Sequence, residues 1–319
     1  MTPDNEVPDH HRRRSGKGGQ TFFPARGTKH NLLVVTRGHA FARDPFYALF
    51  EDNPEIEWSG VEHPAAQLMF APAIARHFDC YVLYDMPGIE FKRHGDGVPV
   101  FHEPPESYRN GLLAMLEEGF PLVILHHACA AWPAWPEWAE IVGGQFLYLP
   151  MKSRGRDRPD SGYRIDAAHR IVPVADHPIT RGVEAFELVD EPYLFEVFED
   201  SVVPLFRSDY SFTAENFFSA RLALAGQLNS NAGWTHAPGS NLVGWVKHYR
   251  NSPIVYLQFG DGPAAYGNPA FRRVLANAIR WACSAEARAW ARERRAAECA
   301  QGGAHSARSA AGSESVSAP

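Results

Sequence analysis

Polar side chains that can move protons or hold metal ions follow the apolar segments of this sequence. In chain order they are Arg37 and His39 after the first segment, Asp85 after the second, His126 and His127 after the third, and Gln258, Asp261 and Tyr266 after the last. Aspartates are common in turns, but imidazoles at two separate segment ends are harder to explain as turn residues. The pattern therefore indicates one polar site built from distant parts of the chain.

The pair His126–His127 closes the segment "PLVILHH", which predicts a strand at 121–126. Successive strand residues point to opposite faces of a sheet. We therefore expect His126 to enter the site as a general base or a ligand and His127 to pack under a helix, although His127 stays among the candidate substrate contacts. A hydrogen-bonded core histidine is the alternative interpretation of each.

The elements that must position these residues alternate between strands and helices. Strands are predicted at 32–36, 80–84 and 121–126, and helical patterns at 44–51, 64–77 and 105–118. A further helix, with Pro133 and Pro136 in its first turn, should end at Gly143. Such alternation is typical of a three-layer α/β fold with a mainly parallel sheet, in which ligands bind beyond the carboxyl ends of the strands.

The second half of the chain predicts short antiparallel strands and then an amphipathic helix in "NPAFRRVLANAIRWAC". We divide the chain into a disordered lead (1–29), an α/β domain (30–284), an exposed helical extension (285–299) and a disordered tail (300–319).

Three more candidates lie in turns of this fold. "VDEPYLF" places the carboxylate of Glu191 and the phenol of Tyr193 in a turn after a short strand. Glu191 could instead cap a helix or loop. Trp132 follows the third strand, where an indole could stack on a sugar ring or pack the next helix.

Composition excludes several classes of function. The 319 residues carry a net charge of −6, which gives no reason to expect a nucleic-acid partner. No apolar run approaches the roughly 18 residues of a membrane span, and the N-terminus lacks a signal-peptide core. The four cysteines show no CxxC spacing, so neither a disulfide framework nor a thiolate zinc site is indicated. There is no nucleotide-cofactor motif, and we expect a reduced, cytoplasmic protein.

Four segments together resemble the ThuA-like family, named for trehalose utilisation and similar in fold to class I glutamine amidotransferases, which have a flavodoxin-like sheet. They are "LLVVTRGHAFARDPF", "LVILHHA" followed by "WPAWPEWAEIVGGQF", "DHPITRGVEAFELVDEPYLF" and "PAFRRVLANAIRWA". The resemblance runs from about residue 30 to 284.

The resemblance implies a site at the third strand end, where amidotransferases carry a nucleophilic cysteine on a sharp turn. His126 takes that position here, so glutaminase chemistry should be absent. The family implies action on oxidised sugars, such as 3-keto derivatives of disaccharides made by a partner sugar oxidoreductase. Relatives often close the last strand with Gly-His where this chain has Gly260–Asp261. Asp261 could supply an oxygen ligand to a divalent metal, or the site could be free of metal.

Three hypotheses arise from these observations. The first is a keto-sugar isomerase, or a hydrolase or lyase, with the catalytic residues His126, Asp85, Glu191 and Asp261 and the substrate contacts His39, Arg37, His127, Trp132, Tyr193 and Tyr266. The second is a non-catalytic binding or regulatory module, which would lack converging titratable groups. The third and weakest is a hydrolase that uses Cys129. The sequence identifies neither the sugar nor the oligomeric state, and a homo-oligomer is one alternative.

Overall fold

The computed structural model describes residues 29–91 and 99–313, with side chains described as far as residue 300. The predicted N-terminal lead therefore lies almost wholly outside the described residues, as do the last six residues of the predicted tail.

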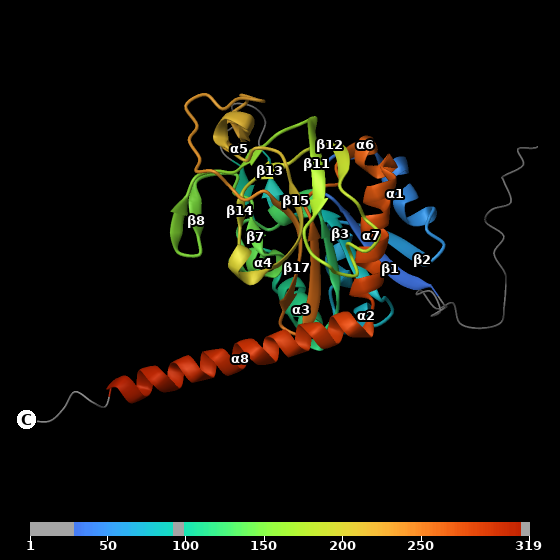
Figure 1. Cartoon of the computed structure of the whole chain (residues 1–319), viewed down its shortest axis with the longest axis vertical. Coiled ribbons are helices and arrows are strands. Elements are labelled where there is room, and N and C mark those ends of the chain that lie inside the picture. The colour runs from blue at the N-terminus through green and yellow to red at the C-terminus, as the bar shows by residue number, and fades with distance from the viewer. Residues whose placement is uncertain (1–28, 92–98, 314–319) are drawn as a thin grey trace, which may run out of the picture.

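A nine-stranded sheet forms the centre of the molecule (Figure 1). Its strands, in spatial order, are β12 (Phe186–Asp190), β11 (Ala167–Pro173), β15 (Val203–Ser208), β17 (Leu242–Tyr249), β18 (Ser252–Leu257), β6 (Leu122–Leu125), β3 (Cys80–Asp85), β1 (His30–Arg37) and β2 (Ile56–Glu62). The five strands from β18 to β2 are parallel to their neighbours, and the pairs from β12 to β18 are antiparallel. The predicted α/β fold is confirmed, with the three predicted strands adjacent as β1, β3 and β6.

Helices cover both faces of this sheet because the parallel strands are apolar on both sides. Leu32 and Val34 face a core shared with α1 (Arg43–Glu51), α6 (Gly262–Gly267) and α7 (Pro269–Ala282). Leu33 and Val35 face the opposite core, which includes α3 (Glu106–Glu118) and α4 (Pro136–Val142). The alternation of strand side chains thus separates the two helical layers.

Two helices differ from the prediction. The segment 64–77 forms a short 3-10 turn, Ala65–Met69, followed by α2 (Pro72–Ala75), and Pro72 begins the second piece because it lacks an N–H group to continue the first. After β6, a 3-10 turn at His126–Ala130 delays α4 until Pro136, since Trp135 is still extended.

The antiparallel strands predicted in the second half of the chain are mostly β11, β12, β15 and β17 of the main sheet, and further short antiparallel strands form small separate sheets. They are β13 (Tyr193–Leu194) with β10 (Gly162–Tyr163) and β16 (Phe218–Ser219), β14 (Glu196–Val197) with β7 (Gly144–Gln145), β4 (Ile89–Glu90) with β5 (Val100–Phe101), and β8 (Met151–Ser153) with β9 (Arg156–Arg158). The small helix α5 (Ala220–Leu224) follows β16 and lies on the same side as β13 (Figure 1).

The last helix, α8, runs from Ala285 to Ser313 and extends away from the body (Figure 1). Its first turns are held by Ala287 and Ala291, which are fully buried. The helix passes residue 299, so the first part of the predicted disordered tail is helical. Alanine and arginine, which favour helices, fill much of this segment.

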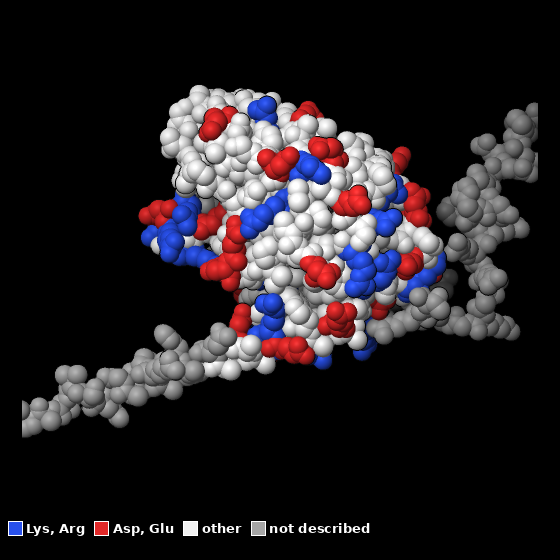
Figure 2. Space-filling view, in the orientation of Figure 1, with Lys and Arg blue, Asp and Glu red and all other residues white. Residues whose placement is uncertain are grey.

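Charges of both signs are interspersed over the face shown in Figure 2. Within the described part of the chain, no helix is long and apolar enough to cross a membrane.

The tight crossing of α3 over the preceding segment gives a stability prediction. A Cβ at Gly111 would lie 1.8 Å from the Phe70 carbonyl oxygen, whereas one at Gly267 would meet no atom within 4 Å. We expect Gly111→Ala to lower the free energy of unfolding by about 1–3 kcal/mol through overpacking, and Gly267→Ala to leave it almost unchanged. Urea unfolding of both variants measures this, and equal stabilities would contradict it.

Candidate active site

His126 occupies a sharp turn at the end of β6. Its φ of +47° lies in the left-handed region, directly after the extended residue Leu125. A residue other than glycine is strained in that region by about 1–3 kcal/mol, and such strain clusters at functional sites. The structure thus places a histidine on the turn that the sequence had singled out.

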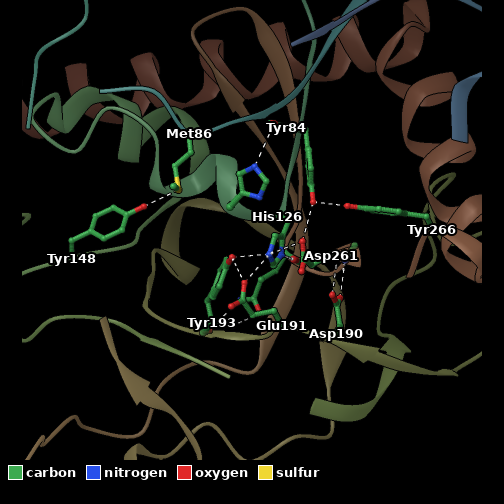
Figure 3. Close-up of polar contacts among 12 residues, drawn as sticks. Tyr84, Met86, His126, Tyr148, Asp190, Glu191, Tyr193, Asp261 and Tyr266 are labelled. Carbon is green, nitrogen blue, oxygen red and sulfur yellow. Dashed lines mark hydrogen bonds and ion pairs between the residues drawn. The ribbon is translucent and has the colours of Figure 1, made fainter. Parts of the chain in front are cut away.

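Hydrogen bonds hold both nitrogens of the fully buried His126 ring (Figure 3). Nδ1 lies 2.7 Å from the Gln258 carbonyl oxygen, which can only accept, so Nδ1 carries a proton. Nε2 lies 2.6 Å from the Tyr193 hydroxyl and 3.3 Å from Glu191 Oε2. Asp261 Oδ1 is 3.8 Å from the same nitrogen. Nδ1 therefore faces a hydrogen-bond acceptor, whereas Nε2 faces the Tyr193 hydroxyl and the carboxylates of Glu191 and Asp261.

These neighbours change the charge of the ring. Burial by itself lowers the pKa of His126, but the carboxylates of Asp261, Glu191 and Asp190 outweigh it and raise the pKa to about 9. His126 is consequently an imidazolium at neutral pH, a proton donor rather than a free base.

The segment after β12 carries Glu191 and Tyr193, the acidic and phenolic partners of His126. Tyr193 donates its hydroxyl proton to Glu191 Oε2 over 2.8 Å. The Gln258 side chain fixes this segment, because its Oε1 accepts from the Tyr193 backbone N–H and its Nε2 donates to the Tyr193 carbonyl oxygen. Burial, together with Glu191 and Asp261, raises the pKa of Tyr193 well above its usual range, so the phenol stays protonated.

Asp190 fixes the turn that carries Asp261. Its carboxylate accepts from the backbone N–H groups of Gly260, at 2.7 Å, and Asp261, at 2.8 Å. Burial raises the pKa of Asp190 to about 6, although His126 and these N–H groups oppose the shift.

A chain of aromatic hydroxyls reaches Asp261 from the other side. Tyr84 donates to Asp261 Oδ1 over 3.0 Å and is itself 2.7 Å from the Tyr266 hydroxyl (Figure 3). Tyr266, a predicted substrate contact, therefore acts through Tyr84 on the carboxylate in this structure.

His39 and His127 lie together beside this cluster, with ring centroids 4.5 Å apart. His127 Nε2 is 3.3 Å from the Tyr84 carbonyl oxygen, which leaves its Nδ1 with the lone pair. Burial, with His39 and His126 as neighbours, lowers the pKa of His127 well below its usual value, so this ring is neutral. The Nδ1 atoms of His39 and His127 are both buried and have no hydrogen-bond partner among the described residues.

His127 corrects one expectation, because it does not turn away under a helix. It lines the same cavity as His39, Glu191 and Tyr193. The alternation argument applies only within a strand, and both histidines lie beyond the end of β6. His126 has a left-handed backbone conformation and begins the 3-10 turn that includes His127. His126 lies behind the cavity wall instead.

This cavity has a volume of about 300 Å³, within the range of small-molecule sites. Besides the phenols of Tyr148 and Tyr163, its polar lining groups are those of His39, His127, Glu191 and Tyr193. Met86, Phe146, Tyr148, Tyr163, α5 and Leu228 contribute much of the remaining wall.

Three predicted site residues lie elsewhere. Asp85 Oδ2 is 2.7 Å from His63 Nε2, and both side chains are buried. Arg37 donates to the His63 carbonyl oxygen over 2.9 Å, and the Trp132 ring packs beside His63. Arg37, Trp132 and His63 line a neighbouring hollow of about 430 Å³.

The alternation of side chains along β3 explains why Asp85 lies outside the site to which the sequence assigned it. Tyr84 belongs to the face of β3 that reaches Asp261, so the next residue, Asp85, points to the opposite face and toward β2. Sequence reasoning missed Tyr84, His63 and Asp190, and the period-2 pattern in "YVLYD" was the signal that could have found Tyr84.

Cys129 is buried behind the same turn. Burial raises the pKa of its thiol to about 12, and a thiol that stays protonated is a poor nucleophile. The structure therefore disfavours the cysteine hydrolase.

The charge on His126 gives a prediction of stability against pH. Its pKa is about 9 in the folded chain and about 6.5 in an unfolded one. Because the folded state binds the proton more tightly, the stabilisation is complete below pH 6.5 and is lost as pH rises through about 9. Cys283 and Lys247, whose pKa values are lowered to about 6 and about 8, add stability to the folded state as pH rises over part of this range. The His126 contribution is therefore the difference between EDTA-treated wild type and His126→Gln, and we expect this difference in unfolding free energy to fall by about 3 kcal/mol across the window, measured by urea unfolding.

His126→Gln should lack the loss that His126 causes between pH 6.5 and 9. His102→Gln, a change in an exposed pair with Glu90, is the matched control and should keep it. The same pH dependence in His126→Gln as in the wild type would show that another group is responsible.

Comparisons with known proteins place the chain in a family. A family model for ThuA, described as trehalose utilisation, matches residues 101–282, more than half of the chain. No curated protein matches. A ThuA-like protein from Parabacteroides merdae shares the fold at 16% identity and a TM-score of 0.55, over 80% of this chain and 90% of its own.

Two further solved structures are similar. A ThuA-like protein from Bacteroides uniformis has 13% identity and a TM-score of 0.50, over 81% of this chain and 93% of its own. A GMP synthase component from Thermoplasma acidophilum has 9% identity and a TM-score of 0.42, over 83% of this chain and 98% of its own. The resemblance inferred from the sequence is confirmed by the family match: this chain belongs to the ThuA family of trehalose-utilisation proteins.

Proposed function

We propose that this chain is an enzyme that acts on an oxidised (keto) sugar by moving a proton beside the carbonyl group. One observation carries the proposal: the buried His126 ring holds the Tyr193 phenol and the Glu191 carboxylate, which are hydrogen-bonded to each other, against the wall of a small cavity. A trehalose-utilisation family makes a sugar substrate the natural class.

The chemistry divides between the two groups that line the cavity. The Glu191 carboxylate would take the proton from the carbon next to the carbonyl, because it is partly exposed whereas His126 is not. The electron pair of that C–H bond would move onto the carbonyl oxygen. The Tyr193 hydroxyl, whose single proton is donated to Glu191 in this structure, would turn to donate it to that oxygen once Glu191 has taken the substrate proton. The positive charge of His126 behind Tyr193 would stabilise the developing enolate. His126, expected as the base, becomes a positioning and electrostatic residue.

An isomerisation is completed when the proton returns to the former carbonyl carbon and the hydroxyl proton of the deprotonated carbon passes to the enolate oxygen. If a leaving group on the next carbon instead departs with its bonding electron pair, as the enolate re-forms the carbonyl, the reaction is an elimination. A keto sugar must first be made from an alcohol, so the proposal includes a partner sugar oxidoreductase, with both proteins in the cytoplasm.

A divalent metal is the second component of the proposal. His39 and His127 offer two buried, unpartnered Nδ1 atoms, and the ligand atoms of these histidines and Asp261 lie within 4.8 Å of one another. Two imidazoles and a carboxylate are a donor set that suits zinc and similar ions. A metal held there would polarise the substrate carbonyl as a Lewis acid.

The binding-module hypothesis predicts a cavity without converging titratable groups. The clustering of Glu191, Tyr193, His39 and His127 on one cavity favours the enzyme instead.

We expect the chain to convert a 3-keto glucoside, followed by NMR, and Glu191→Gln to lower kcat by about 10²-fold or more, the scale for losing a general base. Glu103→Gln, the same change at a carboxylate of the neighbouring hollow, should leave the rate within about twofold. Conversion at the wild-type rate by Glu191→Gln would remove Glu191 from the mechanism, and inertness of the wild type toward every keto glucoside tried would favour the binding module.

For the metal, we expect protein dialysed against Zn²⁺ and then against buffer to retain one ion per chain by elemental analysis. His39→Ala should retain none, because it removes one of three ligands. His236→Ala, at a histidine outside this cluster, should bind like the wild type. Wild-type protein without retained ion would leave the metal-free mechanism in place.

A further inference from the structure

The cavity beside Glu191 is apolar over most of its wall. Among the described lining residues, Met86, Phe146, Leu224 and the alanines of α5 contribute no group that could hydrogen-bond a sugar hydroxyl. This is unusual for a site expected to hold a disaccharide, whose two rings carry many hydroxyls.

The two remaining phenols on the wall are already engaged with the protein. Tyr148 donates to Met86 Sδ over 2.8 Å (Figure 3). The Tyr163 hydroxyl accepts from the Asn229 backbone N–H at 3.1 Å and is 3.4 Å from Asn229 Oδ1. Both tyrosines therefore present mainly ring carbons to a ligand.

The other polar groups of the wall gather at one place. Tyr193 and Glu191 are hydrogen-bonded to each other, and the His39 ring lies tilted against the His127 ring. Asp261 lies close to both histidines and to Glu191. A hydroxyl buried elsewhere on the wall would lose water without gaining a partner, which costs roughly 1–3 kcal/mol in proteins. A second sugar ring in this cavity would bury several such hydroxyls.

The apolar wall continues to the surface at Leu228, whose side chain is 64% exposed. The segment that carries it is fixed rather than loose: Gly226 N–H donates to the Ala223 carbonyl oxygen, and Asn229 is bonded to Tyr163. An apolar side chain held at the mouth of an apolar cavity extends the surface that a ligand can cover.

We infer that the substrate is a glycoside with a single oxidised sugar ring and an apolar, aryl-like aglycone. The part of this inference that concerns the oxidised sugar ring rests on the proposed function. The sugar ring lies at Glu191 and Tyr193, and the aglycone packs against Phe146, Leu224 and Leu228. Plain disaccharides such as trehalose fit this cavity poorly.

The first test is binding, which needs no turnover. Isothermal titration of the full chain with phenyl glucoside, methyl glucoside and trehalose compares ligands that differ in the group attached to the sugar ring. We expect phenyl glucoside to bind about 10-fold or more tightly than either of the others, because a buried ring removes much more apolar surface from water than a methyl group does. Equal affinities, or no detectable binding of phenyl glucoside, would overturn the inference.

Two variants locate the aglycone. Leu228→Asn should reduce the affinity for phenyl glucoside about threefold or more and leave that for methyl glucoside unchanged, and its exposed position makes loss of folding a minor risk. Leu68→Asn is the matched control, since Leu68 is also exposed, at 77%, but does not line the cavity. An unchanged affinity for phenyl glucoside in Leu228→Asn would overturn the placement.

Kinetics separate this inference from the proposed function. If the enzyme converts 3-keto trehalose as efficiently as 3-keto phenyl glucoside, the inference fails and the keto-sugar function stands. If neither is converted but phenyl glucoside still binds preferentially, the function fails and the apolar subsite stands. A higher kcat/KM for the phenyl substrate supports both.

Discussion

The site depends on how one buried cation is neutralised. His126 is held in a left-handed turn between the Gln258 carbonyl oxygen, which fixes one nitrogen as a donor, and the Tyr193–Glu191 pair at the other. Removing a charge from water is costly unless it is paired and hydrogen-bonded. Glu191, Asp190 and Asp261 supply that pairing, so the carboxylates and the imidazolium hold one another in place. The segments that carry Tyr193 and Asp261 are held by hydrogen bonds within this group of buried side chains.

Gln258 and Asp190 transmit this constraint to the fold. Gln258 directly follows β18 and holds Tyr193 of β13 through the oxygen and the nitrogen of its side-chain amide. Asp190 ends β12 and holds the backbone at Gly260 and Asp261. The antiparallel half of the sheet is thereby tied to the parallel half at the edge where the cavity lies. Glu191 can face a largely apolar cavity because its charge is balanced from behind, by His126 and not by solvent.

Much of the fold was predictable because apolar patterns and helix signals are local properties of a sequence. The strands at 32–36 and 80–84, the helix 105–118 and the site at the strand ends all follow from them. The failures have local causes as well: Pro72 broke one helix, and a 3-10 turn replaced strand geometry at His127, which defeated the alternation argument. Asp85 was assigned to the site although alternation from Tyr84 turns it away. The pairing of Asp190 with the turn at Gly260 joins residues 70 positions apart, and no local pattern contains that information.

The protonation state of His126 tests the central claim most directly. Nitrogen-15 NMR of the imidazole rings, in EDTA-treated protein at pH 7.5, distinguishes a doubly protonated ring from a neutral one, and comparison with His126→Gln assigns the signal. The account predicts that both nitrogens of His126 are protonated at this pH and that Nε2 loses its proton only near pH 9. A neutral His126 at pH 7.5 would contradict it, because Tyr193 and Glu191 would then have no buried cation behind them.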